Sequence, residues 1–167
     1  MLDDSLLSLR TEITFMPTRR EQPVYGQTEA FLRERGFLPM GLNALVHWRR
    51  QTTAKYPQSS DTVIPFSRGQ LVHGDALFFR DPSRLAIDDP MPRIKAAFLA
   101  MASGYVDHAY SLVKATPAEA FLADRFGVQV DREFRLVSLF QQRAYHRSRR
   151  FEGLGAAGRL LRKILGS

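Results

Sequence analysis

Residues 69–80 show the most regular pattern of apolar and polar positions in the chain. They read Gly-Gln-Leu-Val-His-Gly-Asp-Ala-Leu-Phe-Phe-Arg. Apolar side chains occur at both odd and even positions, which is typical of a strand covered on both faces. Gly69 and the pair Asp81-Pro82 bound the segment, because glycine frees the backbone and proline cannot continue a β-ladder. We therefore predict an interior strand of an α/β sheet.

The segment before this strand predicts further elements of the same sheet. Residues 6–15 alternate in their second half and are rich in β-formers, so a strand is expected there, ending before Pro17. A helix is expected from residue 27 or 28 to residue 35, ended by Gly36. Its inward-facing side chains are expected to be Ala30, Phe31 and Leu32.

A second strand is predicted over residues 37–48, interrupted by Pro39 and Gly41. Residues 51–68 contain two prolines and little periodicity, and we expect a long loop there. A strand, a helix and two more strands make half of a doubly wound sheet, because a whole one needs a second set of strands.

From residue 90 the pattern becomes helical, and residues 81–92 are the expected boundary between the two parts. Thr116, Pro117 and Glu119 form a capping-box pattern with proline at the first helical position. Glycines in the C-terminal region are expected to end one helix and begin another. The expected helices span residues 93–103, 106–115, 117–126, 131–151 and 155–165.

Composition and charge narrow the class of protein. The chain has 167 residues, 44% hydrophobic and 25% charged, which suits a globular domain with a core. It has no cysteine, lacks a signal-peptide pattern and contains no apolar run of the ~20 residues that span a bilayer, so we expect a cytoplasmic protein. Residues 131–167 hold nine basic and three acidic residues, and so carry most of the net charge of +7. This asymmetry indicates an acidic partner for the tail.

Four stretches taken together carry a family resemblance: residues 9–15 (LRTEITF), 22–25 (QPVY), 30–37 (AFLRERGF) and 69–79 (GQLVHGDALFF). In this order and spacing they resemble the C-terminal half of the FkbM-type S-adenosylmethionine-dependent methyltransferases. The resemblance implies the fifth strand, the following helix and the antiparallel sixth and seventh strands of a class I methyltransferase sheet. It covers residues 6–80.

The expected fold class is therefore α/β, with a partial Rossmann-like sheet of about three strands followed by an α-helical extension. Residues 1–82 would form the C-terminal half of the methyltransferase-like domain. Residues 90–167 would form the basic helical extension. The family's reaction is methyl transfer from S-adenosylmethionine to an oxygen nucleophile on a sugar or polyketide-like acceptor.

The glycine-rich turn that such a cofactor site needs is missing from the sequence. No Gly-x-Gly spacing follows an N-terminal strand. We therefore expect that the chain alone does not bind S-adenosylmethionine well. The strand at residues 6–15 would also have one open edge, so we expect another chain to complete the sheet, the helical tail to cover it, or the chain to pair with itself.

Three side chains are candidates for catalysis. Glu12 lies in the middle of a predicted strand, either near the substrate as the resemblance implies or as a buried acid paired with Arg10 or Arg80. His73 and Asp75 share one side of their strand and could act as general base and orienting group. Such a pair is also common as a polar patch within a core.

Candidate ligand contacts lie in the loop after the first strand, where ligands approach α/β sheets. Arg19, Arg20 and Tyr25 would suit an anionic or sugar-like substrate, although solvated loop charges are an equally good interpretation. His47 and Trp48, followed by two arginines, form a basic and aromatic cluster. The histidines are scattered, so no metal site is expected.

The tail combines an arginine run with a cationic amphipathic pattern, which is typical of helices that lie on anionic membranes. A terminal helix packed on its own domain is the alternative, and nucleic acid is the weakest partner because no nucleic-acid motif is present. The residues expected to contact a membrane or partner are Arg147, Arg149, Arg150, Arg159, Arg162 and Lys163.

Two functions follow from these patterns. The first is a partial or split FkbM-like methyltransferase that is inactive alone. The second is a non-enzymatic remnant that docks to a protein or to a membrane through its basic tail, which would make it a peripheral membrane protein. The absent glycine-rich turn favours the second function unless another polypeptide supplies that turn.

Overall fold

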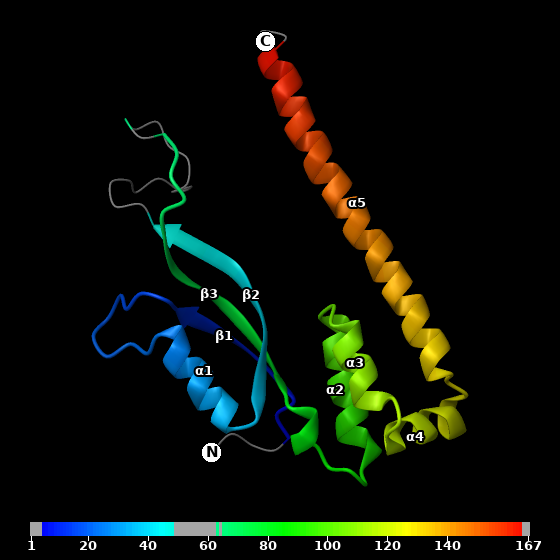
Figure 1. Ribbon diagram of the computed structural model, residues 1–167. Coiled ribbons are helices and arrows are strands. Elements are labelled where there is room, and N and C mark those ends of the chain that lie inside the picture. The colour runs from blue at the N-terminus through cyan, green and yellow to red at the C-terminus, as the bar shows by residue number, and fades with distance from the viewer. Residues whose placement is uncertain (1–4, 49–62, 64, 165–167) are drawn as a thin grey trace. The chain divides into compact units, whose positions relative to one another are not determined.

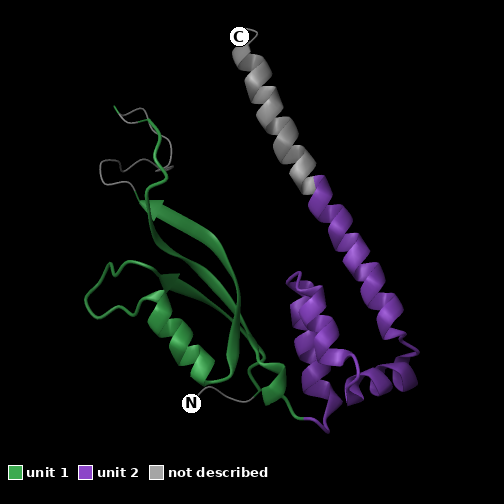
Figure 2. Ribbon diagram, in the orientation of Figure 1, with its two compact units in different colours: residues 1–86 green, residues 87–167 purple. Residues whose placement is uncertain are grey.

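The computed structural model describes residues 5–48, 63 and 65–164, with side chains as far as residue 147. The chain divides into two compact units, residues 1–86 and residues 87–167, which Figure 2 colours separately. The first unit is mixed α/β and the second is helical. The fold is therefore mixed α/β, as the sequence predicts at this level.

The first unit is built on a sheet of three strands (Figure 1). The strands are β1 (Ser8–Thr14), β2 (Phe37–Trp48) and β3 (Gln70–Arg80), in the order β1-β3-β2. β3 pairs antiparallel with both neighbours. The prediction of an interior strand over residues 69–80 is confirmed, and Gly69, at φ +73°, provides the turn into it.

Helix α1 (Tyr25–Glu34) covers one face of this sheet. Its Leu32 is buried in a core with Ile13, Phe37, Ala76 and Phe78. Gly36, at φ +76°, follows its end, as predicted.

The orientation predicted for part of this helix is wrong, because Ala30 and Phe31 are exposed. An α-helix turns about 100° per residue, so three consecutive side chains cannot all face one core. Phe31 instead packs against its own helix, where the Arg35 guanidinium lies 3.6 Å from its ring centroid.

The two faces of β3 differ in burial, which corrects the prediction of a strand covered on both sides. Val72, Ala76 and Phe78 are fully buried, and Ala76 and Phe78 share a core with Leu32 of α1. His73 and Asp75, which lie on the opposite face, are only half-buried. The sequence pattern could not distinguish a strand covered on both faces from one covered on a single face, because Leu71, Leu77 and Phe79 also lie on the more open face.

Strand β2 is irregular, as Pro39 and Gly41 suggest. Its register against β3 shifts between Pro39 and Gly41, between Asn43 and Val46, and between Val46 and His47. Most of the loop predicted over residues 51–68 lies outside the described residues. A short 3-10 turn, η1 (Pro82–Arg84), follows β3.

The second unit contains α2 (Pro90–Ala102), α3 (Val106–Val113), α4 (Pro117–Phe126) and α5 (Val130–Ile164). The start of α4 is as predicted, since the Thr116 hydroxyl accepts from the Ala118 N–H and Pro117 begins the helix. Gly127, at φ +65°, follows α4 in the left-handed conformation, and the predicted end of this helix at residue 126 is confirmed.

The prediction of two helices between residues 131 and 165 is wrong, because α5 is continuous from Val130 to Ile164. Gly153, Gly155 and Gly158 lie within it rather than at its ends. Glycine in a helix costs roughly 1 kcal/mol but does not forbid the helix, and the surrounding leucine, alanine and arginine residues are good helix formers.

Candidate functional site

The sheet face opposite α1 brings together the three candidate catalytic residues. Glu12 of β1 lies directly opposite Asp75 of β3, which in turn lies opposite Asn43 of β2. His73 is two residues from Asp75 on the same strand and lies opposite Thr14. Opposed residues of an antiparallel pair project to the same face. We call Glu12, Asn43, His73 and Asp75 the polar row.

Asp75 is held by an arginine of the neighbouring strand. Its Oδ2 accepts from Arg10 Nε at 3.1 Å and from Arg10 Nη2 at 2.5 Å. The Asp75 side chain is 28% exposed and that of Arg10 is 62% exposed. Asp75 thus has a cationic partner, whereas the sequence suggested that Arg10 would pair with Glu12.

Arg80, the other partner considered for Glu12, lies elsewhere. Its side chain is buried, with the guanidinium carbon 4.8 Å from the Phe37 ring centroid, and its Nη1 donates to the Arg35 carbonyl at 2.8 Å. Arg80 therefore links the start of β2 to the end of α1. It lies on the core side of the sheet, and its hydrogen bond to the Arg35 carbonyl and its contact with Phe37 are both made there.

Glu12 and His73 keep their polar atoms available. Glu12 is exposed, so its carboxylate stays hydrated and the cost of burying an acid does not arise. Within the described part of the chain, neither side chain makes a hydrogen bond or an ion pair. An imidazole and a carboxylate without partners among the described residues therefore lie on the same open face of the sheet.

The loop between β1 and α1 is organised by Gln22. Its Oε1 accepts from Thr18 N and Thr18 Oγ1, both at 3.0 Å, and from Arg19 N at 3.3 Å. Its Nε2 donates to Thr14 Oγ1 at 2.9 Å. Gln22 therefore ties the loop to the end of β1, next to the register position of His73. Sequence analysis missed this role, because a glutamine in a polar loop gives no distinctive signal.

The three predicted ligand residues near this loop fall into two groups. Arg19 and Arg20 are exposed. Tyr25 begins α1 and packs against the core, with its ring centroid 5.5 Å from that of Phe15. Of the three predicted ligand residues, Arg19 and Arg20 therefore offer exposed charged groups to a ligand, whereas Tyr25 is part of the core packing.

The remaining candidates in this unit do not gather into a site. Trp48 is 50% exposed at the end of β2, next to His47. The arginines at positions 49 and 50 lie outside the described residues. Among the residues that the structure describes, no group of three histidine, aspartate or glutamate side chains could hold a metal ion.

The second unit contains a charged cluster that joins three helices. Lys114 Nζ, just after α3, donates to Glu119 Oε1 of α4 at 2.8 Å and to Asp131 Oδ2 of α5 at 2.9 Å. Tyr110 Oη donates to Asp131 Oδ1 at 2.7 Å, and Ala115 N donates to Glu119 Oε2 at 2.8 Å. The cluster therefore fixes the α3–α4 turn to the start of α5.

The pKa values of these groups are shifted by their hydrogen bonds. The Lys114 ammonium lowers the pKa of Glu119, and the Tyr110 hydroxyl, followed by Lys114, lowers that of Asp131. The two carboxylates in turn raise the pKa of Lys114 well above its usual value. The hydrogen bond to Asp131 raises the pKa of Tyr110. All four groups thus favour their usual charge states at neutral pH.

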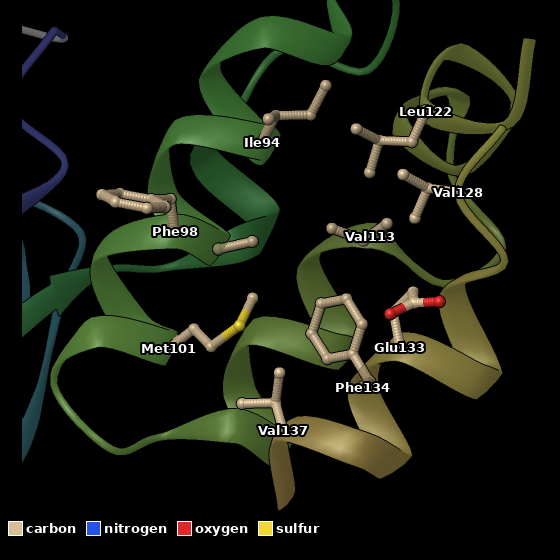
Figure 3. A pocket seen from close by; sticks show the side chains of 10 residues that line it. Ile94, Phe98, Met101, Val113, Leu122, Val128, Glu133, Phe134 and Val137 are labelled. Carbon is tan, nitrogen blue, oxygen red and sulfur yellow. The ribbon is translucent and has the colours of Figure 1, made fainter. Parts of the chain in front are cut away.

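Beside this cluster lies an apolar pocket of about 260 Å³ (Figure 3). Phe134 and Val137 of α5 point into it, opposite Met101 of α2. Glu133 is its one charged lining residue. The full lining is Ile94, Ala97, Phe98, Met101, Val113, Leu122, Val128, Glu133, Phe134 and Val137. With so few polar groups, the pocket can exclude water but offers no set of groups for acid–base chemistry.

The basic residues predicted to contact a membrane or partner all belong to α5. Arg147 is exposed. The other five side chains, those of Arg149, Arg150, Arg159, Arg162 and Lys163, lie beyond the described side chains. No helix within the described ranges is both long enough and apolar enough to cross a membrane.

Comparison of the chain with protein-family models, curated proteins and solved structures found no match.

Proposed function

We propose that residues 1–82 act as the C-terminal, substrate-side half of an FkbM-type methyltransferase domain. The observation that carries this proposal is the order β1-β3-β2 around α1, with β3 antiparallel to both neighbours. A strand, a helix and two antiparallel strands are the elements that the resemblance implies for residues 6–80. The reaction would be methyl transfer to a hydroxyl group of a sugar or polyketide-like acceptor.

The described residues do not fit S-adenosylmethionine. Nucleotide-type cofactors bind at the carboxyl ends of adjacent parallel strands, beside a glycine-rich turn. Both pairings in this sheet are antiparallel, and the positive-φ glycines 36, 69, 104 and 127 follow helices or precede β3. The cofactor-binding half would therefore come from outside these residues.

What this chain would contribute is the acceptor side. His73, whose imidazole has no hydrogen-bond partner among the described residues, is the candidate base for the acceptor hydroxyl, and Glu12 is the alternative. Asp75, held by Arg10, would orient polar groups of the acceptor rather than remove a proton. Arg19 and Arg20 would meet an anionic or hydroxyl-rich acceptor at the loop fixed by Gln22.

The open edge of β1 is where the missing half would join. In the described sheet, β1 pairs only with β3. The hydrogen bonds from Arg80 N to Leu7 O and from Phe15 N to Val72 O show the bonding pattern of this pair of strands. The backbone N–H and C=O groups of odd-numbered β1 residues point toward β3. The N–H groups of Arg10 and Glu12 therefore point to the open edge, because bonding direction alternates along a strand.

The test is a chimera in which the full 167-residue chain is fused to the C-terminus of the cofactor-binding half of an FkbM-type methyltransferase. We expect no calorimetric heat with S-adenosylmethionine for the chain alone and micromolar binding by the chimera. Glu12→Pro, which removes the outward N–H, should weaken binding, whereas Glu12→Ala keeps that N–H and should not.

Two results would oppose the proposal. A chimera that neither folds cooperatively nor binds the cofactor would reject the assignment of residues 1–82 to this domain. Micromolar cofactor binding by the 167-residue chain itself would mean that the chain carries its own cofactor site, so it would not be half of a domain.

A second candidate function is docking to an anionic membrane or acidic partner through α5. It is favoured by the continuity of α5, which carries the exposed Arg147 and the basic sequence after it on one helix. Exchange of Arg149 and Arg150 for Glu should abolish binding to anionic vesicles. Unchanged binding after that exchange would reject this function.

A further inference from the structure

One side of the first half of α5 is turned away from the rest of the helical unit. Phe134 and Val137 point into the apolar pocket (Figure 3), and Gln141 Nε2 donates to the Met101 carbonyl at 3.1 Å. These contacts define the inward side. Because an α-helix turns about 100° per residue, positions 136, 139 and 140 fall on the other side.

Large apolar side chains occupy that outward side. Phe140 is 73% exposed, Leu136 is 51% exposed and Leu139 is 39% exposed. Leu136 lies three residues before Leu139 and four before Phe140, so its side chain adjoins both of theirs and the three form one patch. Exposed single apolar residues are common, but a contiguous patch of three indicates a surface that is covered in use.

Arginines surround this patch. Arg132, Arg135, Arg143 and Arg147 are all exposed. The one acidic residue between positions 132 and 147, Glu133, borders the pocket but is exposed, with its Oε1 4.0 Å from Arg132 Nε. The outward surface therefore combines aliphatic and aromatic groups with an excess of positive charge, four arginines against one glutamate at its edge. We call these three apolar residues and four arginines the α5 outer face.

We propose that the α5 outer face is a binding surface for an anionic lipid bilayer, in which Leu136, Leu139 and Phe140 enter the interface and the four arginines contact lipid headgroups. This inference rests on the second candidate function and goes beyond it. It specifies lipid as the partner. It also assigns the apolar contact to residues that precede the basic sequence on which the second candidate function was based.

The chemistry favours lipid over the other anionic partners. Apolar side chains among the arginines would be a disadvantage on nucleic acid, where phosphate contacts supply most of the affinity. A protein partner would need a groove shaped for these three side chains. A bilayer accommodates any helix of this kind, since arginine stems extend along the apolar layer and place their charges at the headgroups.

The test is co-sedimentation of the full chain with phosphatidylserine-containing vesicles and with pure phosphatidylcholine vesicles. We expect binding only to the anionic vesicles. Leu136→Ser with Phe140→Ser should weaken binding about tenfold or more, because each buried methylene adds to the affinity. Arg143→Glu with Arg147→Glu should weaken it on the order of 100-fold.

Matched controls lie in the same unit away from α5. Ile87→Ser removes an exposed apolar side chain, and Lys95→Glu with Arg125→Glu makes the same change of charge. Neither should change the affinity for vesicles by more than about twofold, apart from a small general charge effect. Circular dichroism and thermal melting would establish that each variant is folded.

The outcomes separate this inference from the function on which it rests. If exchange of Arg149 and Arg150 abolishes binding while Leu136→Ser with Phe140→Ser leaves it intact, the tail docks but the α5 outer face does not insert, and the inference is overturned. Equal binding to both kinds of vesicle, or binding to an acidic polypeptide without vesicle binding, would also overturn it.

Discussion

Asp75 Oδ2 accepts two hydrogen bonds from the guanidinium of Arg10, a residue 65 positions earlier in the chain. The pair crosses from the central strand to β1 and sits beside Glu12, which lies directly opposite Asp75. Two carboxylates in opposed positions repel each other, and Arg10 offsets that repulsion. The pair therefore sets the charge of the polar row.

A double-mutant cycle on Arg10→Met and Asp75→Asn should give a coupling free energy of about 0.2–1 kcal/mol in urea unfolding, because Arg10 is well exposed. The coupling should shrink as salt concentration rises. Arg10→Met should cost more stability in the wild-type protein than in the Asp75→Asn variant. In the wild-type background, it leaves the carboxylates of Asp75 and Glu12 opposite each other without a cation. A coupling of zero at low salt would show that the pair has no role in stability.

Gln22→Ala should release the loop between β1 and α1. It removes three accepted hydrogen bonds and the one donated to Thr14 Oγ1, and each such bond contributes about 1 kcal/mol. Hydrogen exchange at the amides of Thr18 and Arg19 should speed up. Gln22→Glu is the matched control, because it keeps the acceptor and loses the donor, and it should show a smaller effect. Unchanged exchange in Gln22→Ala would contradict this account of the loop.

The Lys114 cluster predicts how the stability of the helical unit depends on pH. The folded-state pKa values of Glu119 and Asp131 are lowered, so their stabilisation is present above the ordinary values of 4.5 and 3.8 and is lost as pH falls through the lowered values. The raised pKa of Lys114 adds stabilisation that is present below 10.5 and lost only above it. Thermal melting should therefore be flat between about pH 6 and pH 9 and fall in acid.

Lys114→Met tests the assignment of this pH dependence. The variant should be less stable at neutral pH and should lose less stability on acidification, because Glu119 no longer gains from the ammonium. Lys95→Met, which removes an exposed lysine of α2, is the control and should keep the wild-type profile. An unchanged acid limb in Lys114→Met would place the pH dependence in other groups.

Gly69 and Gly36 make a matched pair for backbone strain. Both have positive φ, +73° and +76°. A Cβ at position 69 would lie 2.8 Å from the Trp48 carbonyl oxygen, whereas one at position 36 would meet the flexible Arg84 side chain at 2.8 Å. Gly36→Ala should cost about 1 kcal/mol and Gly69→Ala clearly more, because a backbone oxygen cannot move aside easily. Equal costs in urea unfolding would contradict this ranking.

Local signals in the sequence predicted much of this fold. The strands β1, β2 and β3 were found because glycine and proline mark their ends, and the start of α4 was found because Thr116 and Pro117 act within one turn of the chain. The continuity of α5 was missed for the same reason, since its glycines have the local form of a helix end. Short-range rules cannot show whether a helix continues through such positions.

The candidate site depended on information that lies between strands. The sequence placed His73 and Asp75 on one side of a strand, and this followed from the period of two. That Glu12 lies opposite Asp75, and that Arg10 bonds Asp75 rather than Glu12, follows only from the register of β1 against β3. Register joins residues far apart in sequence, so one chain read alone does not determine it.

The irregular register of β2 gives the sheet two unlike edges. Leu42, Leu45 and Trp48 leave β2 with large exposed apolar side chains, which on a flat outer strand would favour aggregation. Its three shifts in register twist and interrupt that edge, and interrupted edges are poor templates for a further strand. Regular β1 has no such protection within the described sheet. In the described sheet, β1 is therefore the better template for a further strand, and a strand that extends the sheet should add beside β1 rather than beside β2.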